Sequence, residues 1–208
     1  MAVTNNVSTF LGKIGQGVKP NMFNVDIKFP EGADATGDRD LFQLMCKSAA
    51  LPGSNLGVIE VPFRGRTVKI AGDRTFDTWT ATFFNDRKMQ LRAFFEEWAN
   101  EINTHEANTA ERFLPTSNDA AGYMAELFVS QLEKDNSESG SAIRTYHLFY
   151  CFPTNVSPID LAYDSNDQIE EFTVEWQYSY FKAGGADQAR TAGAKPKEAS
   201  DADQRTVN

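Results

Sequence analysis

The residues able to do acid–base or nucleophilic chemistry are few and scattered along this chain. The two histidines, His105 and His147, lie in the segments NTHEAN and TYHLFY, with no cysteine or serine beside them as a nucleophile. Nucleophilic catalysis would need such a nucleophile next to a base. The two cysteines, Cys46 and Cys151, have apolar neighbours and form no CxxC pair. We therefore expect reduced, buried thiols and no metal site.

The remaining candidates for chemistry are adjacent carboxylates and glycine motifs. The pairs Glu96–Glu97 and Glu170–Glu171 are expected on solvated surfaces, because neighbouring residues on a helix or strand do not converge on one site. Neither a phosphate-binding G-x-x-x-x-G-K-[ST] loop nor a dinucleotide-binding G-x-G-x-x-G turn occurs. The sequence predicts no enzymatic activity and no cofactor.

Charge excludes a further class of function. The 208 residues hold 20 Lys+Arg and 29 Asp+Glu, a net charge of −9. Residues 1–20 add two positive charges and 183–208 add none, which leaves −11 on residues 21–182. A protein that grips DNA through its phosphates needs the opposite sign. With a mean hydropathy of −0.45 and no run of about 18 apolar residues, we expect no membrane anchor and an intracellular protein.

Most of the chain alternates apolar and polar residues with the period of a β-strand. In the last and clearest example, Phe172, Val174 and Trp176 alternate with Glu171, Thr173 and similar residues. The predicted strands cover 23–29, 41–49, 58–64, 66–72, 76–84, 123–133, 143–152 and 168–181.

One segment has the helical period instead. From about 86 to 104, apolar residues form a single stripe behind an N-cap at Asn85 or Asp86. The stripe comprises Leu91, Phe94, Phe95, Trp98 and Ile102. The pattern favours a mainly β fold, a sandwich or barrel with this one long flanking helix.

The chain divides into three parts by composition. Residues 1–20 are rich in glycine and predict an arm anchored by Val7, Phe10, Leu11 and Ile14. Residues 21–182 form one β-domain. Residues 183–208 lack aromatics and predict a flexible extension, because they cannot bury enough apolar surface to fold alone.

A basic hairpin stands out within the acidic domain. Residues 60–75 carry four cations, Arg64, Arg66, Lys69 and Arg74, against two carboxylates, and Gly65 marks the turn. A basic projection on an acidic protein suits docking onto another copy of itself. A simply solvated hairpin is the alternative interpretation.

Four segments of the sequence together resemble the tail tube proteins of contractile-tailed, T4-like bacteriophages. They are KSAALPG at 47–53, VPFRGRTVKIAGDRTFDTWTATFFND at 61–86, FFEEW at 94–98 and FPTNVSPIDLAYDSNDQIEEFTVEWQYSYF at 152–181. The resemblance implies hexameric rings that stack into a hollow tube within a contractile sheath. It also implies a tube that grows from a baseplate and a tube-initiator protein around a tape-measure protein, conducts DNA, and is assembled in the host cytoplasm as part of the virion.

These expectations assign three surfaces. Ring-to-ring contact is expected at Arg64, Gly65, Arg66, Lys69 and Arg74. A DNA-repelling lumen wall is expected at Asp26, Glu171, Glu175 and Gln177. A sheath-facing surface is expected at Glu96, Glu97 and Glu101.

Other functions stay open on the sequence alone. Within the structural class, the chain could be an inner tube or tube-initiator protein of a related contractile injection system. A small β-barrel binding module would need a basic groove with interleaved aromatics, which the −11 domain lacks. An enzyme would need at least one nucleophile–base pair.

Overall fold

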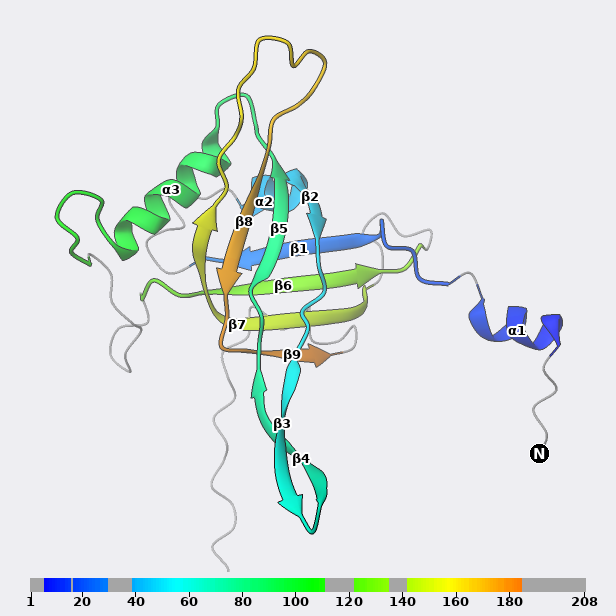
Figure 1. The fold of residues 1–208 in the computed structure, drawn as a ribbon. Helices are drawn as coiled ribbons and strands as arrows, with labels where there is room; N and C mark the ends of the chain where they lie inside the picture. Colours follow the sequence, from blue (N-terminus) through cyan, green and yellow to red (C-terminus); the bar gives the residue numbers. More distant parts are fainter. Residues whose placement is uncertain (1–5, 16, 30–38, 111–121, 135–141, 185–208) are drawn as a thin grey trace, which may run out of the picture.

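The computed structural model describes residues 6–15, 17–29, 39–110, 122–134 and 142–184. Figure 1 shows the arrangement of the helices and strands in these residues. They follow in the order α1 (Val7–Ile14), β1 (Phe23–Lys28), α2 (Arg39–Met45), β2 (Cys46–Ala49), β3 (Asn55–Phe63), β4 (Arg66–Thr75), β5 (Trp79–Phe84), α3 (Gln90–Ile102), β6 (Ala125–Leu132), β7 (Ala142–Val156), β8 (Glu171–Gln177) and β9 (Tyr180–Gly184).

The long strand β7 joins two halves of one antiparallel sheet of order β1-β6-β7-β8-β5-β2. Its first part pairs with β6 and β9, and its last residues, from Phe152, pair with β8. Between the two parts Tyr150 has a φ of 58°, so the strand departs from extended geometry at this point. We call β1, β6, β9 and the first part of β7 the β6 half, and β2, β5, β8 and the end of β7 the β8 half. The halves cross in Figure 1.

The core lies between these two halves and is rich in aromatic rings. Phe42 from α2 packs 5.0 Å from Phe83 of β5, measured between ring centroids, and Phe95 from α3 packs 5.6 Å from Trp176 of β8. All four of these residues are fully buried. The mainly β fold with one long flanking helix is therefore confirmed.

Helix α3 has the predicted apolar face but is shorter than predicted. It runs from Gln90 to Ile102, and Leu91, Phe94, Phe95 and Trp98 are buried. The formal N-cap residue is Met89, with no side-chain cap. Asp86 nevertheless accepts from the backbone N–H of Gln90 at 2.7 Å, so the predicted aspartate satisfies a free amide at the start of the helix from outside it.

Two predicted strands are wrong in part. Residues 41–49 begin as helix α2, and only Cys46–Ala49 form a strand. In the helix, Leu41, Phe42 and Met45 turn toward the core. The strand predicted at 168–181 is interrupted after Gln177, and β9 then leaves β8 to pair with β7. Tyr180 consequently stacks on Phe149, with ring centroids 4.7 Å apart, instead of continuing the buried row of β8.

The predicted N-terminal arm contains helix α1, whose apolar residues do not anchor it. The exposed fractions of Val7, Phe10, Leu11 and Ile14 range from 49 % to 73 %, and Figure 1 shows the helix projecting from the body. Of the extension predicted at 183–208, the described residues include only 183 and 184, which belong to β9.

Candidate assembly surfaces

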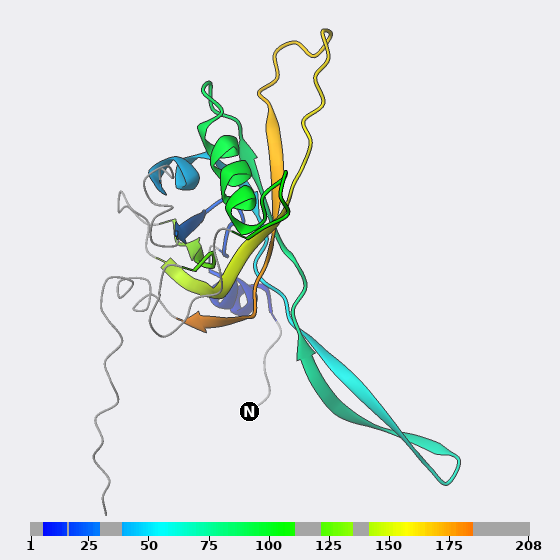
Figure 2. The same ribbon diagram turned by 90° about the vertical axis from the view of Figure 1, so that its left-hand side faces the viewer.

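A two-stranded hairpin, β3 and β4, projects from the body at one end of the molecule (Figures 1 and 2). Arg64 and Gly65 connect the strands with φ angles of 45° and 80°. Positive φ at both central residues is the two-residue turn whose twist matches that of paired strands. The turn predicted at Gly65 is confirmed, and the strands are longer than predicted.

One face of this hairpin is almost wholly apolar. Cross-strand partners Ile59 and Ile70, and Val61 and Val68, lie beside Phe63, which is paired with Arg66. All five apolar side chains are at least 41 % exposed. Exposed apolar surface of this kind marks an interaction site or an aggregation hazard. The charges of this segment do not reveal the apolar face, whereas the alternation of apolar and polar residues in both strands indicates it.

The predicted basic residues do not form one cluster. Arg64 and Arg66 lie at the tip, and the Arg64 guanidinium is 5.4 Å from the centroid of the Phe63 ring. Lys69 lies 3.5 Å from the Glu60 carboxylate of the same hairpin, so its charge is partly compensated. Arg74 lies opposite Leu56 in the strand register, at the base of the hairpin. The tip therefore carries two arginines without an acidic partner among the described residues.

The predicted lumen residues of β8 lie together on the outer face of the β8 half. Glu171, Glu175 and Gln177 alternate with the buried residues of β8. Lys47 of β2 donates to both carboxylate oxygens of Glu171, at 2.5 and 2.6 Å. The neighbouring hydroxyls of Thr82 and Thr173 lie 3.1 Å apart. This face is polar and only weakly acidic, which the sequence pattern of β8 alone did not reveal.

Asp26 lies elsewhere. It belongs to β1 in the β6 half, between the buried residues Val25 and Ile27. Its carboxylate accepts from the Arg39 Nε at 2.6 Å and pairs with the same guanidinium through its second oxygen. Because the core separates the two halves, the structure does not bring Asp26 together with the carboxylates of β8.

The three carboxylates predicted to face the sheath do not form one exposed surface. Glu97 is exposed on α3. Glu96 accepts from the Arg92 Nε at 2.8 Å, and the same guanidinium donates to the Ser157 carbonyl at 3.0 Å. Glu101 is half-buried. Only Glu96 and Glu97 therefore contribute to an exposed acidic face on this helix.

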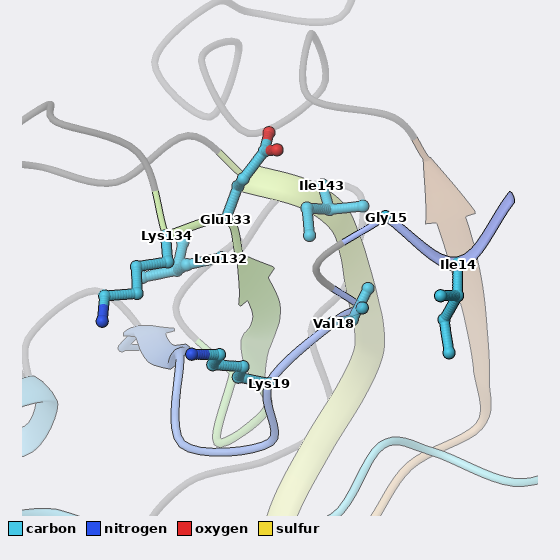
Figure 3. A pocket seen from close by; sticks show the side chains of 9 residues that line it. Ile14, Gly15, Val18, Lys19, Leu132, Glu133, Lys134 and Ile143 are labelled. Atoms are coloured by element: carbon cyan, nitrogen blue, oxygen red, sulfur yellow. The ribbon is translucent and has the colours of Figure 1, made fainter. Parts of the chain in front are cut away.

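A hollow of about 540 Å³ lies where the N-terminal arm meets the ends of β6 and β7 (Figure 3). Val18, Leu132 and Ile143 supply apolar side chains, while Glu133 and Lys134 lie at the end of β6. Gln131 binds the arm beside this hollow, because its amide nitrogen donates to the carbonyls of Lys19 and Met22 at 2.8 and 2.5 Å. The root of the arm is thus fixed to the body although α1 projects.

The side chains of His147, Cys46 and Cys151, considered as candidates for chemistry, pack against neighbouring residues of the fold. His147 lies 3.3 Å from the Glu126 carboxylate and stacks on Phe128, with ring centroids 4.2 Å apart. This close imidazole lowers the pKa of Glu126 below the ordinary carboxyl value, against the opposing effect of burial. Burial raises the pKa of Cys46 and of Cys151 to about 12. Both thiols are therefore poor nucleophiles at neutral pH.

Among the described ranges, no group of three or more His, Cys, Asp and Glu side chains could hold a metal ion. In the same ranges, no helix is long and apolar enough to span a membrane.

Comparison with known proteins assigns the family. A family model described as phage tail tube protein matches residues 18–184. The tail tube protein gp19 of Enterobacteria phage T4 is 33 % identical over 168 residues, which cover 81 % of this chain and 93 % of the relative. The tail tube protein gp19 of phage T6 is 32 % identical with the same coverage.

Solved structures show the same fold. A chain from the sheath–tube complex of an extracellular contractile injection system, in its extended state, superposes with a TM-score of 0.55. It is 16 % identical in sequence, and the match covers 88 % of this chain and 99 % of that one.

This chain thus shares its fold with a subunit of a contractile assembly, and its hairpin projects from the body (Figure 2). The chain belongs to the phage tail tube protein family. It is a structural component of the virion tail.

Proposed function

We propose that six copies of this chain close into a ring and that rings stack into the inner tube of a contractile tail, through which the genome passes. The observation that carries this proposal is the family match over residues 18–184. An apolar, basic hairpin standing clear of the body supports it, because such a surface suits contact with another copy (Figure 2).

Lateral contacts within a ring are assigned to the sheet edges. Strands β1 and β2 are the two ends of the strand order, so each offers backbone groups on one side to a neighbouring subunit. Joining such edges in a closed ring removes the unpaired strands that otherwise invite aggregation.

Stacking between rings is assigned to the hairpin. Arg64, Gly65 and Arg66 form the contacting tip, while Lys69 and Arg74 flank it along β4. Charged groups at such a contact mainly determine register and specificity, whereas the apolar face supplies the area removed from water.

The lumen wall is assigned to the outer face of β8, with Glu171 paired to Lys47 at one end of the strand, Gln177 at the other end and Glu175 between them. Asp26 is left out of this wall because it lies in the β6 half. A hydrated, weakly acidic wall, on a chain of net charge −9, lets DNA pass without binding it.

Other partners follow from the same assembly. The exposed face of α3 with Glu96 and Glu97 is assigned to transient contact with the sheath protein, since a polar contact can release when the sheath contracts. The tube grows from the baseplate and its initiator around the tape-measure protein. The function needs no enzymatic activity and no cofactor.

Electron microscopy of the purified protein tests the stacking assignment. The wild-type chain should form hollow rods, and Arg64→Glu/Arg66→Glu should form rings or monomers that do not elongate. Arg64→Lys/Arg66→Lys keeps the charge and should still form rods. Rods of wild-type length from the glutamate variant would contradict the assignment.

A second candidate, the tube of an injection system that carries no genome, is favoured by the fold shared with the extracellular injection system. Recovering DNA-filled tails that contain this chain would decide in favour of the phage tail.

A further inference from the structure

The loop between β7 and β8 encloses a hollow at the end of the molecule opposite the hairpin. Its volume is about 770 Å³. Phe84, Ile159, Leu161 and Ile169 contribute apolar side chains to its lining. Leu161 and Ile169 are 80 % and 68 % exposed. Their side chains therefore present apolar surface to water that an apolar partner could cover.

The base of this loop is held by contacts to the body. The Ser157 hydroxyl accepts from the Thr173 N–H at 2.8 Å, and the Ser157 carbonyl accepts from Arg92 at 3.0 Å. On the other side, the Asn85 amide donates to the Glu170 carboxylate at 3.1 Å. These contacts give the hollow a fixed place relative to α3 and the β8 half.

The charge of the loop is opposite to that of the hairpin tip. Residues 157–171 contain five carboxylates and no lysine or arginine. Two of these, Glu170 and Glu171, have the partners Asn85 and Lys47. The others, Asp160, Asp164 and Asp167, have no cationic partner among the described residues.

The hairpin and the hollow lie at opposite ends of the molecule, connected through the paired strands β5 and β8. The hairpin leads into β5, β5 pairs with β8, and β8 begins at the end of the loop. In both views the loop, in yellow and orange, and the hairpin, in cyan and green, extend from the body in opposite directions (Figures 1 and 2). The tip of one chain therefore cannot reach its own hollow, but a second copy displaced along the direction from hairpin to hollow can.

We propose that the hollow under loop 157–170 receives the hairpin tip of a second copy of this chain, and this inference rests on the proposed function of the hairpin in stacking. The Phe63 ring enters beside Leu161 and Ile169. Arg64 and Arg66 pair with Asp160 and Asp167 at the rim. Because the two surfaces differ, the contact is head-to-tail and leaves one unused tip and one unused hollow at the ends, so it can repeat without limit.

Cross-linking between copies tests the contact directly. The variant Arg66→Cys/Asp167→Cys, assembled and treated with a short bis-maleimide, should give a ladder of covalent multimers on a denaturing gel. Each single variant should give none. The native thiols can remain, because burial raises their pKa to about 12 and slows their reaction. Assembled tubes of the double variant that yield no ladder would overturn the inference.

Charge exchange separates this inference from the proposed function. Arg64→Asp/Arg66→Asp and Asp160→Arg/Asp167→Arg should each lose elongation, while the chain that combines all four substitutions should recover it. Asp160→Glu/Asp167→Glu, which keeps the charge, should elongate normally. Unfolding temperatures equal to that of the wild type would show that each variant is folded.

The outcomes are distinct. If the hairpin variant fails to elongate and the loop variant elongates normally, the hollow is not the receiving surface, although the hairpin still stacks. If the hairpin variant elongates like the wild type, the proposed function of the hairpin fails. If both variants fail and the combined chain also fails, direct pairing of these charges is overturned.

Discussion

Trp98 of α3 is among the largest fully buried side chains of the described residues. It is 1 % exposed, and its indole Nε1 donates to the Tyr123 carbonyl at 3.0 Å. Trp98→Ala should lower the free energy of unfolding by about 3–5 kcal/mol, because a large cavity remains in the core. Denaturant unfolding measures this loss. Glu97→Ala, one residue away on the exposed side, should change it by less than about 0.5 kcal/mol. Equal stability of both variants would contradict the assignment of the stripe to the core.

At this scale, the sequence predicts burial better than it predicts ion pairs. The burial of Phe172, Val174 and Trp176 was predictable, since a period of two identifies one face of a strand. The ion pair between Lys47 and Glu171 was not predictable, because these residues are 124 positions apart in the sequence. The charge of the β8 wall therefore required the three-dimensional structure.

At the scale of elements, the two strands of the hairpin approach each other closely at Gly57 and Gly72. At its base, a Cβ on Gly72 would lie 3.2 Å from backbone atoms of Gly57 and 3.3 Å from the Ile59 side chain. Gly72→Ala should therefore force the strands apart and redirect the tip. We expect an unchanged unfolding temperature for the body and shorter tubes by microscopy.

Gly53→Ala is the matched control for this change, because nothing lies within 4 Å of the added methyl group and the residue precedes the hairpin. If both variants assemble alike, the close approach of Gly57 and Gly72 does not orient the hairpin.

Element types were predictable where one period extends over many residues, as in α3 and β8. The segment 41–49 was not, because its apolar residues fit either a short strand or one helical face. Contact of Phe42 with Phe83 and Trp176 stabilises the helical choice. The receiving loop at 157–170 has no regular secondary structure and no period, so its hollow could not be predicted from pattern.

For the whole assembly, the proposed lumen wall makes a prediction about DNA passage. Glu175→Lys/Gln177→Lys should leave assembly intact, because neither side chain forms an ion pair among the described residues. DNA release from the variant phage should slow, most strongly at low salt, since each ring would attract phosphates. Time-resolved release of fluorescently stained DNA measures the rate. Glu106→Lys, at an exposed position assigned to no contact surface, is the control. Normal release from the lumen variant at low salt would contradict the wall assignment.

The apolar face of the hairpin has a further consequence, which concerns heat capacity. If tube growth removes Ile59, Val61 and Phe63 from water, it must lower the heat capacity of the system, as apolar burial does. The attraction between apolar surfaces weakens on cooling. Subunits should therefore need a higher concentration to extend a tube in the cold than at the temperature of infection. A calorimetric titration of subunits onto tube ends should show a heat of addition that becomes more negative as the temperature rises.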